Sequence, residues 1–273
     1  MKRFLKIIKT ITLFLLRTIL TQVGGLIYLI YKPLSGFIGQ RYRKGVQRFT
    51  MKIIAFSLLF CGFSFLIIPP IAKQFGRVAL PIYATKDVPI KPATILTCIA
   101  NRHYVKPQLL VILKTVAEEN RDRELIYLDA NFPFISGFPL LPHKSHDDGE
   151  KVDIAFNYLN GNTKKSVNKT PTLFGYGYCE APKKGEYSQP KVCAKKGYWQ
   201  YSLLEKITRQ NKNYVFDAKA TKKLLLKFIK QPKIKKIFIE PHLKQRLNLQ
   251  KENKIRFHGC GAVRHDDHIH LQL

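Results

Sequence analysis

The sequence predicts an α+β domain that follows an N-terminal membrane anchor. Residues 53–72 carry no charge and match the thickness of a bilayer core in length. Beyond residue 93, runs rich in β-branched and aromatic residues are mixed with runs rich in Ala, Leu and Lys, which is typical of strands combined with helices. The 273 residues leave room for one sizeable domain plus an appendage. We therefore expect a small antiparallel sheet with flanking helices at residues 93–273.

The chain is strongly basic, with a net charge of +29 spread along its whole length. Such a surface attracts polyanions: nucleic acid, anionic lipid or the acidic polymers of a bacterial envelope. The sequence contains no zinc-finger spacing, RNP-like aromatic sequence or Gly-rich phosphate loop, so we expect no specific nucleic-acid partner.

Residues 1–31 are expected to form one long helix with a basic tendency on one face. Lys2, Lys6, Lys9 and Arg17 follow helical spacing, and most other positions are Leu, Ile or Phe. This pattern favours an interfacial helix on the anionic cytoplasmic leaflet, because Lys9 and Arg17 would be costly in hydrocarbon. A spanning helix is the alternative.

The following segments predict an orientation in the membrane. Residues 32–52 contain basic but no acidic residues, which is typical of a cytoplasmic loop. Residues 53–72 lie too far from the N-terminus for a cleavable signal peptide and are expected to be a retained transmembrane helix. A linker at 73–92 then leads to a domain in the periplasm or at the cell exterior. A two-helix hairpin with both ends outside is the competing topology.

Local patterns predict the elements of the domain. In chain order we expect a helix from Pro107, strands at 124–130 and 152–158, a long surface loop at 160–197, a helix at 218–229 capped by Asp217, a strand at 234–239 and a short helix at 241–247. Core packing of Tyr198, Trp199 and Tyr201 is favoured over an exposed stacking wall.

Cysteine usage agrees with export, since an even number falls in the predicted domain: Cys98, Cys179, Cys193 and Cys260. Four cysteines allow three pairings. Cys179 and Cys193 flank one loop, which favours their pairing and leaves Cys98 for Cys260. Free thiols are the alternative.

The last ten residues, 264–273, contain three of the chain's eight histidines. From His268 the pattern alternates, so His268 and His270 would point to one face of a strand. Ile269 and Leu271 would point to the other face and pack into the core. A strand held in this way keeps its imidazoles rigid, as a metal site requires.

The matching upstream pattern is His146-x6-Asp153, with Gly149 midway to supply a tight turn. Asp153 lies between two apolar residues, where a carboxylate is costly unless it is paired or bound to metal. Together with one histidine of the last strand, this pair makes three ligands. Three ligands with a fourth position left for water are typical of catalytic zinc.

These paired motifs resemble the lysostaphin/D-Ala-D-Ala-peptidase/hedgehog group of zinc metallopeptidases. In detail the chain is similar to the penicillin-insensitive murein endopeptidases, which carry an extra histidine three residues before the first ligand, as His143 stands here. Their C-terminal signature His-Asp-Asp-His-x-His matches the run from His265 to His270. The resemblance covers residues 95–273 and does not include the anchor.

The resemblance implies a Zn²⁺ ion held by His146, Asp153 and His270. Some members of the family carry a second metal site after the first motif. The corresponding residues 176–184 contain no histidine, so the resemblance does not extend to a second ion.

The resemblance also implies the catalytic groups. His268 would be the general base or would stabilise the tetrahedral intermediate, and His265 and His143 would line the site and polarise the oxyanion. The chain has no His-Glu-x-x-His, so a protease with a glutamate base is not expected. His242 is expected on the surface or at a helix start, and His258 is given no role.

The implied activity is hydrolysis of peptide cross-links in peptidoglycan, at a D-alanyl-to-diaminopimelyl bond. A D-Ala-D-Ala carboxypeptidase is a close second hypothesis, since its relatives share the pattern from Ser145 to Asp153. Those relatives place a glutamate where His265 stands, which favours the endopeptidase. Two hypotheses of a different class are a non-catalytic wall-binding module on the same scaffold and a polyanion-binding membrane protein whose histidines are incidental.

Overall fold

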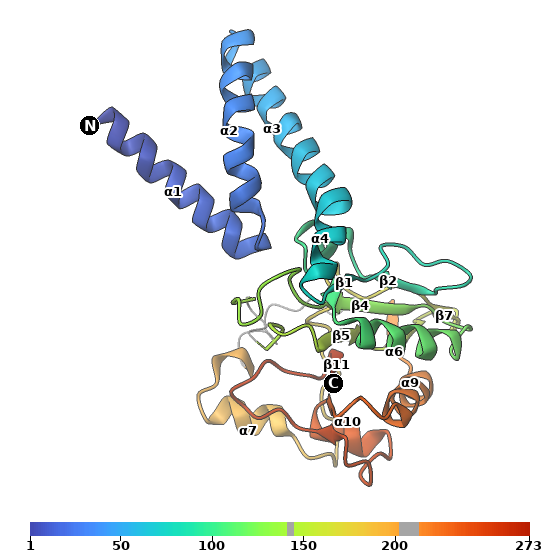
Figure 1. Ribbon diagram of the computed structural model, residues 1–273. Coiled ribbons are helices and arrows are strands. Elements are labelled where there is room, and N and C mark those ends of the chain that lie inside the picture. The colour runs from blue at the N-terminus through green and yellow to red at the C-terminus, as the bar shows by residue number, and fades with distance from the viewer. Residues whose placement is uncertain (141–144, 202–212) are drawn as a thin grey trace.

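The computed structural model describes residues 1–140, 145–201 and 213–273. These residues form a mixed α/β domain, from one side of which the N-terminal helices rise (Figure 1). Within the described ranges, one helical stretch, Gly45–Gln74, is long and apolar enough to cross a membrane by length and composition. It contains the span expected at 53–72.

The N-terminal region differs from the expected single helix and loop. Helix α1 (Lys2–Thr21) ends at Gln22, whose φ is 63°, and α2 (Gly24–Arg41) turns back along it. The two helices approach so closely that a Cβ on Gly25 would overlap Thr18 Oγ1. The expected continuous helix over 1–31 is therefore wrong.

The expected loop at 32–52 is also wrong, because most of it is helical. Helix α2 continues to Arg41 and α3 (Gly45–Gly62) begins four residues later. A short π-helix η1 (Phe63–Ile67) then joins α3 to α4 (Ile68–Gln74). Basic residues without acidic ones mark a side of the membrane, but they do not distinguish a loop from a helix.

Among the described residues, the main sheet has six strands in the order β10-β9-β11-β5-β4-β2. It is mixed rather than wholly antiparallel, since β10 pairs in parallel with β9 and β2 with β4. The bounds are β2 (Ile90–Pro92), β4 (Leu125–Asp129), β5 (Lys151–Ala155), β9 (Lys236–Phe238), β10 (Ile255–Arg256) and β11 (His268–Gln272). The histidine-rich strand β11 thus lies inside the sheet, between β5 and β9.

The remaining strands form two small sheets in the described part of the chain. Strand β1 (Val78–Ala79) pairs with β3 (Tyr104–Val105), and β6 (Tyr158–Asn160) lies between β7 (Ser166–Val167) and β8 (Tyr214–Phe216). The helices of the domain are α5 (Ile95–Ile99), α6 (Pro107–Glu118), α7 (Gln189–Lys195), α9 (Ala218–Lys230) and α10 (Pro241–Arg246).

Strong local signals located most of these helices. Helices α6, α9 and α10 lie where they are expected, and the Asp217 side chain caps α9 by accepting from the Ala220 backbone N–H at 2.9 Å. Helix α7 lies inside residues 160–197, which were expected to form one long surface loop. That expectation is wrong for the residues of α7. Of the three aromatic residues expected in the core, Tyr201 is buried but Trp199 is 66% exposed.

The N-terminal helices pack directly against the domain, where the sequence predicted a free linker at 73–92. The Gln22 side chain accepts from the Phe134 backbone N–H at 2.8 Å, and Asn101 donates to Ser64 Oγ in η1 at 3.0 Å. Arg77, just beyond α4, donates to the Asp148 carbonyl and to Ser136 Oγ. Gln22 and Arg77 therefore contact the segments on either side of residues 141–144.

A disulfide joins Cys193 in α7 to Cys260 in the loop before β11, with Cα atoms 5.3 Å apart. Cys98 and Cys179 are free thiols, so the favoured pairings are wrong. The bond ties the loop that precedes β11 to a helix 67 residues earlier in the chain.

We predict that Cys193→Ser and Cys260→Ser each destabilise the protein by about 2–4 kcal/mol, because closing a loop of this length restricts the unfolded chain. Thermal unfolding followed by the fluorescence of Trp199 measures the loss. The double variant should cost no more than either single one, since both remove the same bond. Equal destabilisation by Cys179→Ser would contradict this pairing. So would a pair of peptides joined by a Cys179–Cys193 disulfide in a non-reducing digest.

Candidate metal centre

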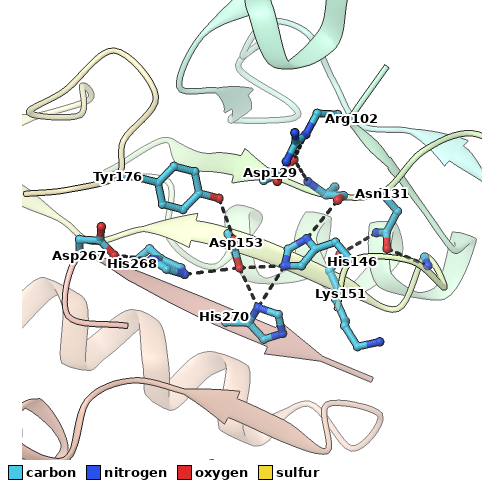
Figure 2. Close-up of polar contacts among 12 residues, drawn as sticks. Arg102, Asp129, Asn131, His146, Lys151, Asp153, Tyr176, Asp267, His268 and His270 are labelled. Carbon is cyan, nitrogen blue, oxygen red and sulfur yellow. Dashed lines mark hydrogen bonds and ion pairs between the residues drawn. The ribbon is translucent and has the colours of Figure 1, made fainter. Parts of the chain in front are cut away.

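Three buried side chains converge on one point in the middle of the main sheet (Figure 2). Asp153 Oδ1 lies 2.8 Å from His270 Nδ1 and 3.2 Å from His146 Nε2, and the two imidazole nitrogens are 3.1 Å apart. All three side chains are almost completely buried. Their donor atoms form a group that could hold a metal ion.

Strand register brings two of the three predicted ligands together. Strands β5 and β11 are antiparallel neighbours in which His270 is directly opposite Asp153. The predicted alternation on β11 is confirmed, because His268 and His270 face the cluster while Ile269 and Leu271 belong to the hydrophobic core.

The third predicted ligand, His146, reaches the cluster through the turn that precedes β5. Gly149 has a φ of 81° there, and its N–H donates to Asn131 Oδ1 at 2.9 Å. A Cβ at this position would overlap the Arg77 guanidinium, and the positive φ is one that residues with a side chain rarely adopt, so glycine is favoured in this turn. The tight turn expected at Gly149 is confirmed, and it lets His146 face the strand that carries Asp153.

Neighbouring groups fix the orientation of the donor atoms. His146 Nδ1 lies 3.0 Å from the Ala130 carbonyl oxygen, which can only accept, so Nδ1 carries the hydrogen and Nε2 presents a lone pair. Tyr176 donates from its hydroxyl to Asp153 Oδ2 at 2.7 Å and leaves Oδ1 directed at the histidines. Burial, together with the negative charge of Asp153, raises the pKa of Tyr176 well above its usual value, so this phenol stays a donor.

The protonation state of His270 suits metal binding. Burial lowers the pKa of His270 to about 4, although Asp153 opposes the shift, so the imidazole is neutral at pH 7. Neutral imidazoles and an ionised carboxylate are the forms that bind Zn²⁺, which holds them at about 2.0–2.1 Å and therefore roughly 3.3 Å apart in a tetrahedron. The spacing of 2.8–3.2 Å among Asp153 and the two histidines is close to that requirement. The residues present thus fit a zinc-sized ion.

Two more predicted site histidines lie beside the cluster. His268 Nε2 is 3.7 Å from Asp153 Oδ1, and its Nδ1 pairs with the Asp267 carboxylate. The ring of His265 lies 4.9 Å from that of His268 and 5.6 Å from that of His270, centroid to centroid. His143 lies outside the described residues.

The two aspartates of the C-terminal motif act differently from one another. Asp267 accepts from His268 Nδ1 and from the Gly177 backbone N–H, so it orients an imidazole. Asp266 forms a buried ion pair with Arg264 and contacts no imidazole through a hydrogen bond that the structure describes.

Sequence patterns did not point to Tyr176, which comes from a segment without periodicity.

His258 was given no role, but it lies beside the site histidines. Its side chain is exposed, and its ring stacks on the buried ring of His265 with 5.5 Å between the centroids. His242 is at a helix start as expected, but it is buried rather than on the surface. Its Nε2 lies 2.7 Å from the Glu180 carbonyl.

Glu240 holds the backbone of His265. Its Oε1 accepts from the His265 backbone N–H and from the Tyr201 hydroxyl, both at 3.3 Å. Burial, reinforced by the charge of Asp266, raises the pKa of Glu240 to about 7. The carboxyl group is therefore half-protonated near neutral pH in the folded protein.

Comparison with known proteins adds no further identification, since no protein-family model and no curated protein matches this chain.

We predict that Tyr176→Phe weakens metal affinity by about tenfold to a hundredfold, because the variant loses the hydroxyl that holds Asp153 in its binding orientation. Competition with a chromophoric chelator measures the affinity. Tyr178→Phe is the matched control, since its hydroxyl donates to the Tyr214 carbonyl, away from the cluster. An equal effect of both substitutions would contradict the role given to Tyr176.

The raised pKa of Glu240 predicts a pH-dependent stability. The unfolded chain ionises near the ordinary value of 4.5, whereas the folded protein keeps its proton up to about 7, so stability falls as pH rises through this window. The fall amounts to about 3 kcal/mol for a shift of this size. Glu240→Gln should remove it while keeping the acceptor for His265. Parallel chemical denaturation of both proteins from pH 4 to 8 measures the difference, and identical slopes would contradict the prediction.

Proposed function

We propose that the protein is a membrane-anchored zinc metallopeptidase that hydrolyses peptide cross-links in peptidoglycan, of the D-alanyl endopeptidase type. One observation carries the proposal: His146, Asp153 and His270 converge from two separate motifs, with further imidazoles at their side. The motifs themselves resemble those of the murein endopeptidases.

Zinc bound by these three residues would polarise a scissile carbonyl and lower the pKa of a bound water towards neutrality. The neighbouring residues suit the proton transfers that peptide hydrolysis needs. Since Asp267 accepts the Nδ1 hydrogen of His268, the lone pair of His268 is on Nε2, the nitrogen nearest to Asp153. His268 can therefore accept a proton from the attacking water and return it to the leaving amine.

His265 suits a different task. Burial lowers its pKa well below the usual value, and the neighbouring His268 and His270 shift it in the same direction, so the ring stays neutral. A neutral imidazole can donate one hydrogen bond to a carbonyl oxygen as negative charge develops there. Glu240 and the loop closed by the Cys193–Cys260 disulfide hold it in place.

The proposed substrate follows from the resemblance and fits the physical character of the chain. The apolar stretch Gly45–Gln74 suits a protein kept at the inner membrane, and the net charge of +29 favours residence near anionic wall polymers. The domain would then face the periplasm or cell exterior, where peptidoglycan lies.

The full chain in detergent, incubated with purified murein, tests the function. We predict conversion of cross-linked dimers to monomers, loss of this activity with a chelator and recovery on adding zinc, read by mass spectrometry of the muropeptides. Release of terminal D-Ala alone would make the protein a carboxypeptidase. Intact murein with zinc bound at one ion per chain would favour a wall-binding module and contradict catalysis.

A variant separates catalysis from metal binding in the same assay. His268→Gln should keep the zinc content and lower turnover by about 10²–10⁴-fold, the usual contribution of a general base. Tyr178→Phe again serves as the control with unchanged turnover. Loss of zinc from His268→Gln would instead make His268 a ligand.

A further inference from the structure

We propose that α1, α2 and α3 cross the membrane as one packed three-helix unit, with the N-terminus and the α2–α3 turn on the cytoplasmic side. The topology rests on the membrane location included in the proposed function, but not on peptidase activity. The first acidic residue of the chain is Asp87, so every charge before it is positive. These charges fall mainly at two places.

One group of basic residues lies at the start of α1 and the other around the turn between α2 and α3; they are Arg3, Lys6 and Lys9, and Arg41, Arg43, Lys44 and Arg48. Residues 18–31, around the turn between α1 and α2, carry no charge. By the positive-inside rule, both basic groups belong in the cytoplasm and the uncharged turn outside.

The contacts with the domain place the uncharged α1–α2 turn on the side of the membrane where the domain lies, which is also the outside. Gln22, in that turn, bonds to the backbone of Phe134 and Ile135. At the other end of the unit, α4 and Arg77 also lead into the domain. Figure 1 shows α1, α2 and α3 extending from this one face of the domain. The charge pattern and the packing therefore agree on which ends lie together.

Of the described helices, only the stretch Gly45–Gln74, which contains α3, is apolar enough to cross a membrane alone, so α1 and α2 would cross as parts of the packed unit, and their lengths fit this. Helix α1 has 20 residues and α2 has 18, which corresponds to about 30 and 27 Å at 1.5 Å per residue. The hydrocarbon core of a bilayer is about 30 Å thick. If the basic start of α1 reaches the cytoplasmic headgroups, Arg3, Lys6 and Lys9 escape most of the cost of hydrocarbon by extending towards them.

The contacts between the helices are those of a packed membrane unit. Gly24 and Gly25 let α2 approach Thr18 and Thr21 of α1, as small residues do at helix interfaces in membranes. Tyr31 in α2 donates to the Lys52 carbonyl in α3 at 2.8 Å. These contacts make α1 part of the unit rather than a separate surface helix.

The cations within the unit either contact partners on a neighbouring helix or extend towards the surface of the membrane. The Arg17 guanidinium lies over the rings of Tyr28 and Phe56, at 4.5 and 5.1 Å, so it contacts both α2 and α3. Lys32 in α2 donates to Thr10 in α1 at 3.0 Å. Lys52 extends alongside Gly39, towards the basic turn.

Labelling of single introduced cysteines with a membrane-impermeant maleimide tests the topology in bacterial spheroplasts. The sites are Arg3→Cys, Arg43→Cys and, as the outside control, Lys86→Cys, all at exposed positions. The parent chain gives the background from its own thiols. We expect residue 86 to be labelled in intact spheroplasts, and residues 3 and 43 only after lysis.

Any different labelling pattern overturns the proposal in its own way. Labelling of residue 3 with protection of residue 43 would mean a two-helix hairpin with α1 on the outer surface. Labelling of all three positions would remove the membrane crossing altogether. Protection of residue 86 with labelling of residue 43 would invert the topology. None of these results depends on murein hydrolysis, so a failed topology and a failed enzyme assay remain distinguishable.

Discussion

The pairing of β11 with β5 is the constraint on which the candidate site depends. It places His270 opposite Asp153 and fixes which face of β11 carries the imidazoles. A slip of one residue would send His268 and His270 into the core and Ile269 and Leu271 to the cluster. Burial of Ile269 and Leu271 therefore holds the register, and the chemistry of the opposite face follows from it.

The same sheet connects the site to the N-terminal helices. Asn131, which follows β4, accepts from the Gly149 N–H and donates to the carbonyls of Tyr104 and Lys151. Arg77, three residues after the end of α4, fills the space beside Gly149. The turn that delivers His146 is thus bounded by the sheet on one side and by the segment that follows α4 on the other. A fragment that begins after α4 would lose the contacts made by Gln22 and Ser64 and would expose apolar surface around Tyr104.

Local signals in the sequence were sufficient for much of the fold and for the residues that meet in the candidate metal centre. Alternation along β11, the capping Asp217 of α9 and the His146-x6-Asp153 spacing all lie within a few residues, so each pattern reports its own structure. The disulfide could not be found in this way, because Cys193 and Cys260 meet only through tertiary packing. Tyr176 is a similar case, since a phenol bonded to Asp153 has no characteristic spacing. The helical state of residues 32–41 was missed because the loop was predicted from basic residues without acidic ones, a pattern that a helix can carry equally well, and α2 continues through Pro33.

The ligand cluster also affects the energetics of folding. Asp153 is buried beside the nitrogens of two imidazoles, and a buried carboxylate is costly without a cation or several donors. Tyr176 supplies a donor to Oδ2, but Oδ1 faces His146 Nε2, which presents a lone pair rather than a hydrogen. Without a cation, a hydrogen on His270 Nδ1 can be donated both to Asp153 Oδ1 and to the lone pair of His146 Nε2. A bound divalent ion satisfies all three donor atoms at once, so its binding free energy would add directly to the stability of the β5–β11 pair.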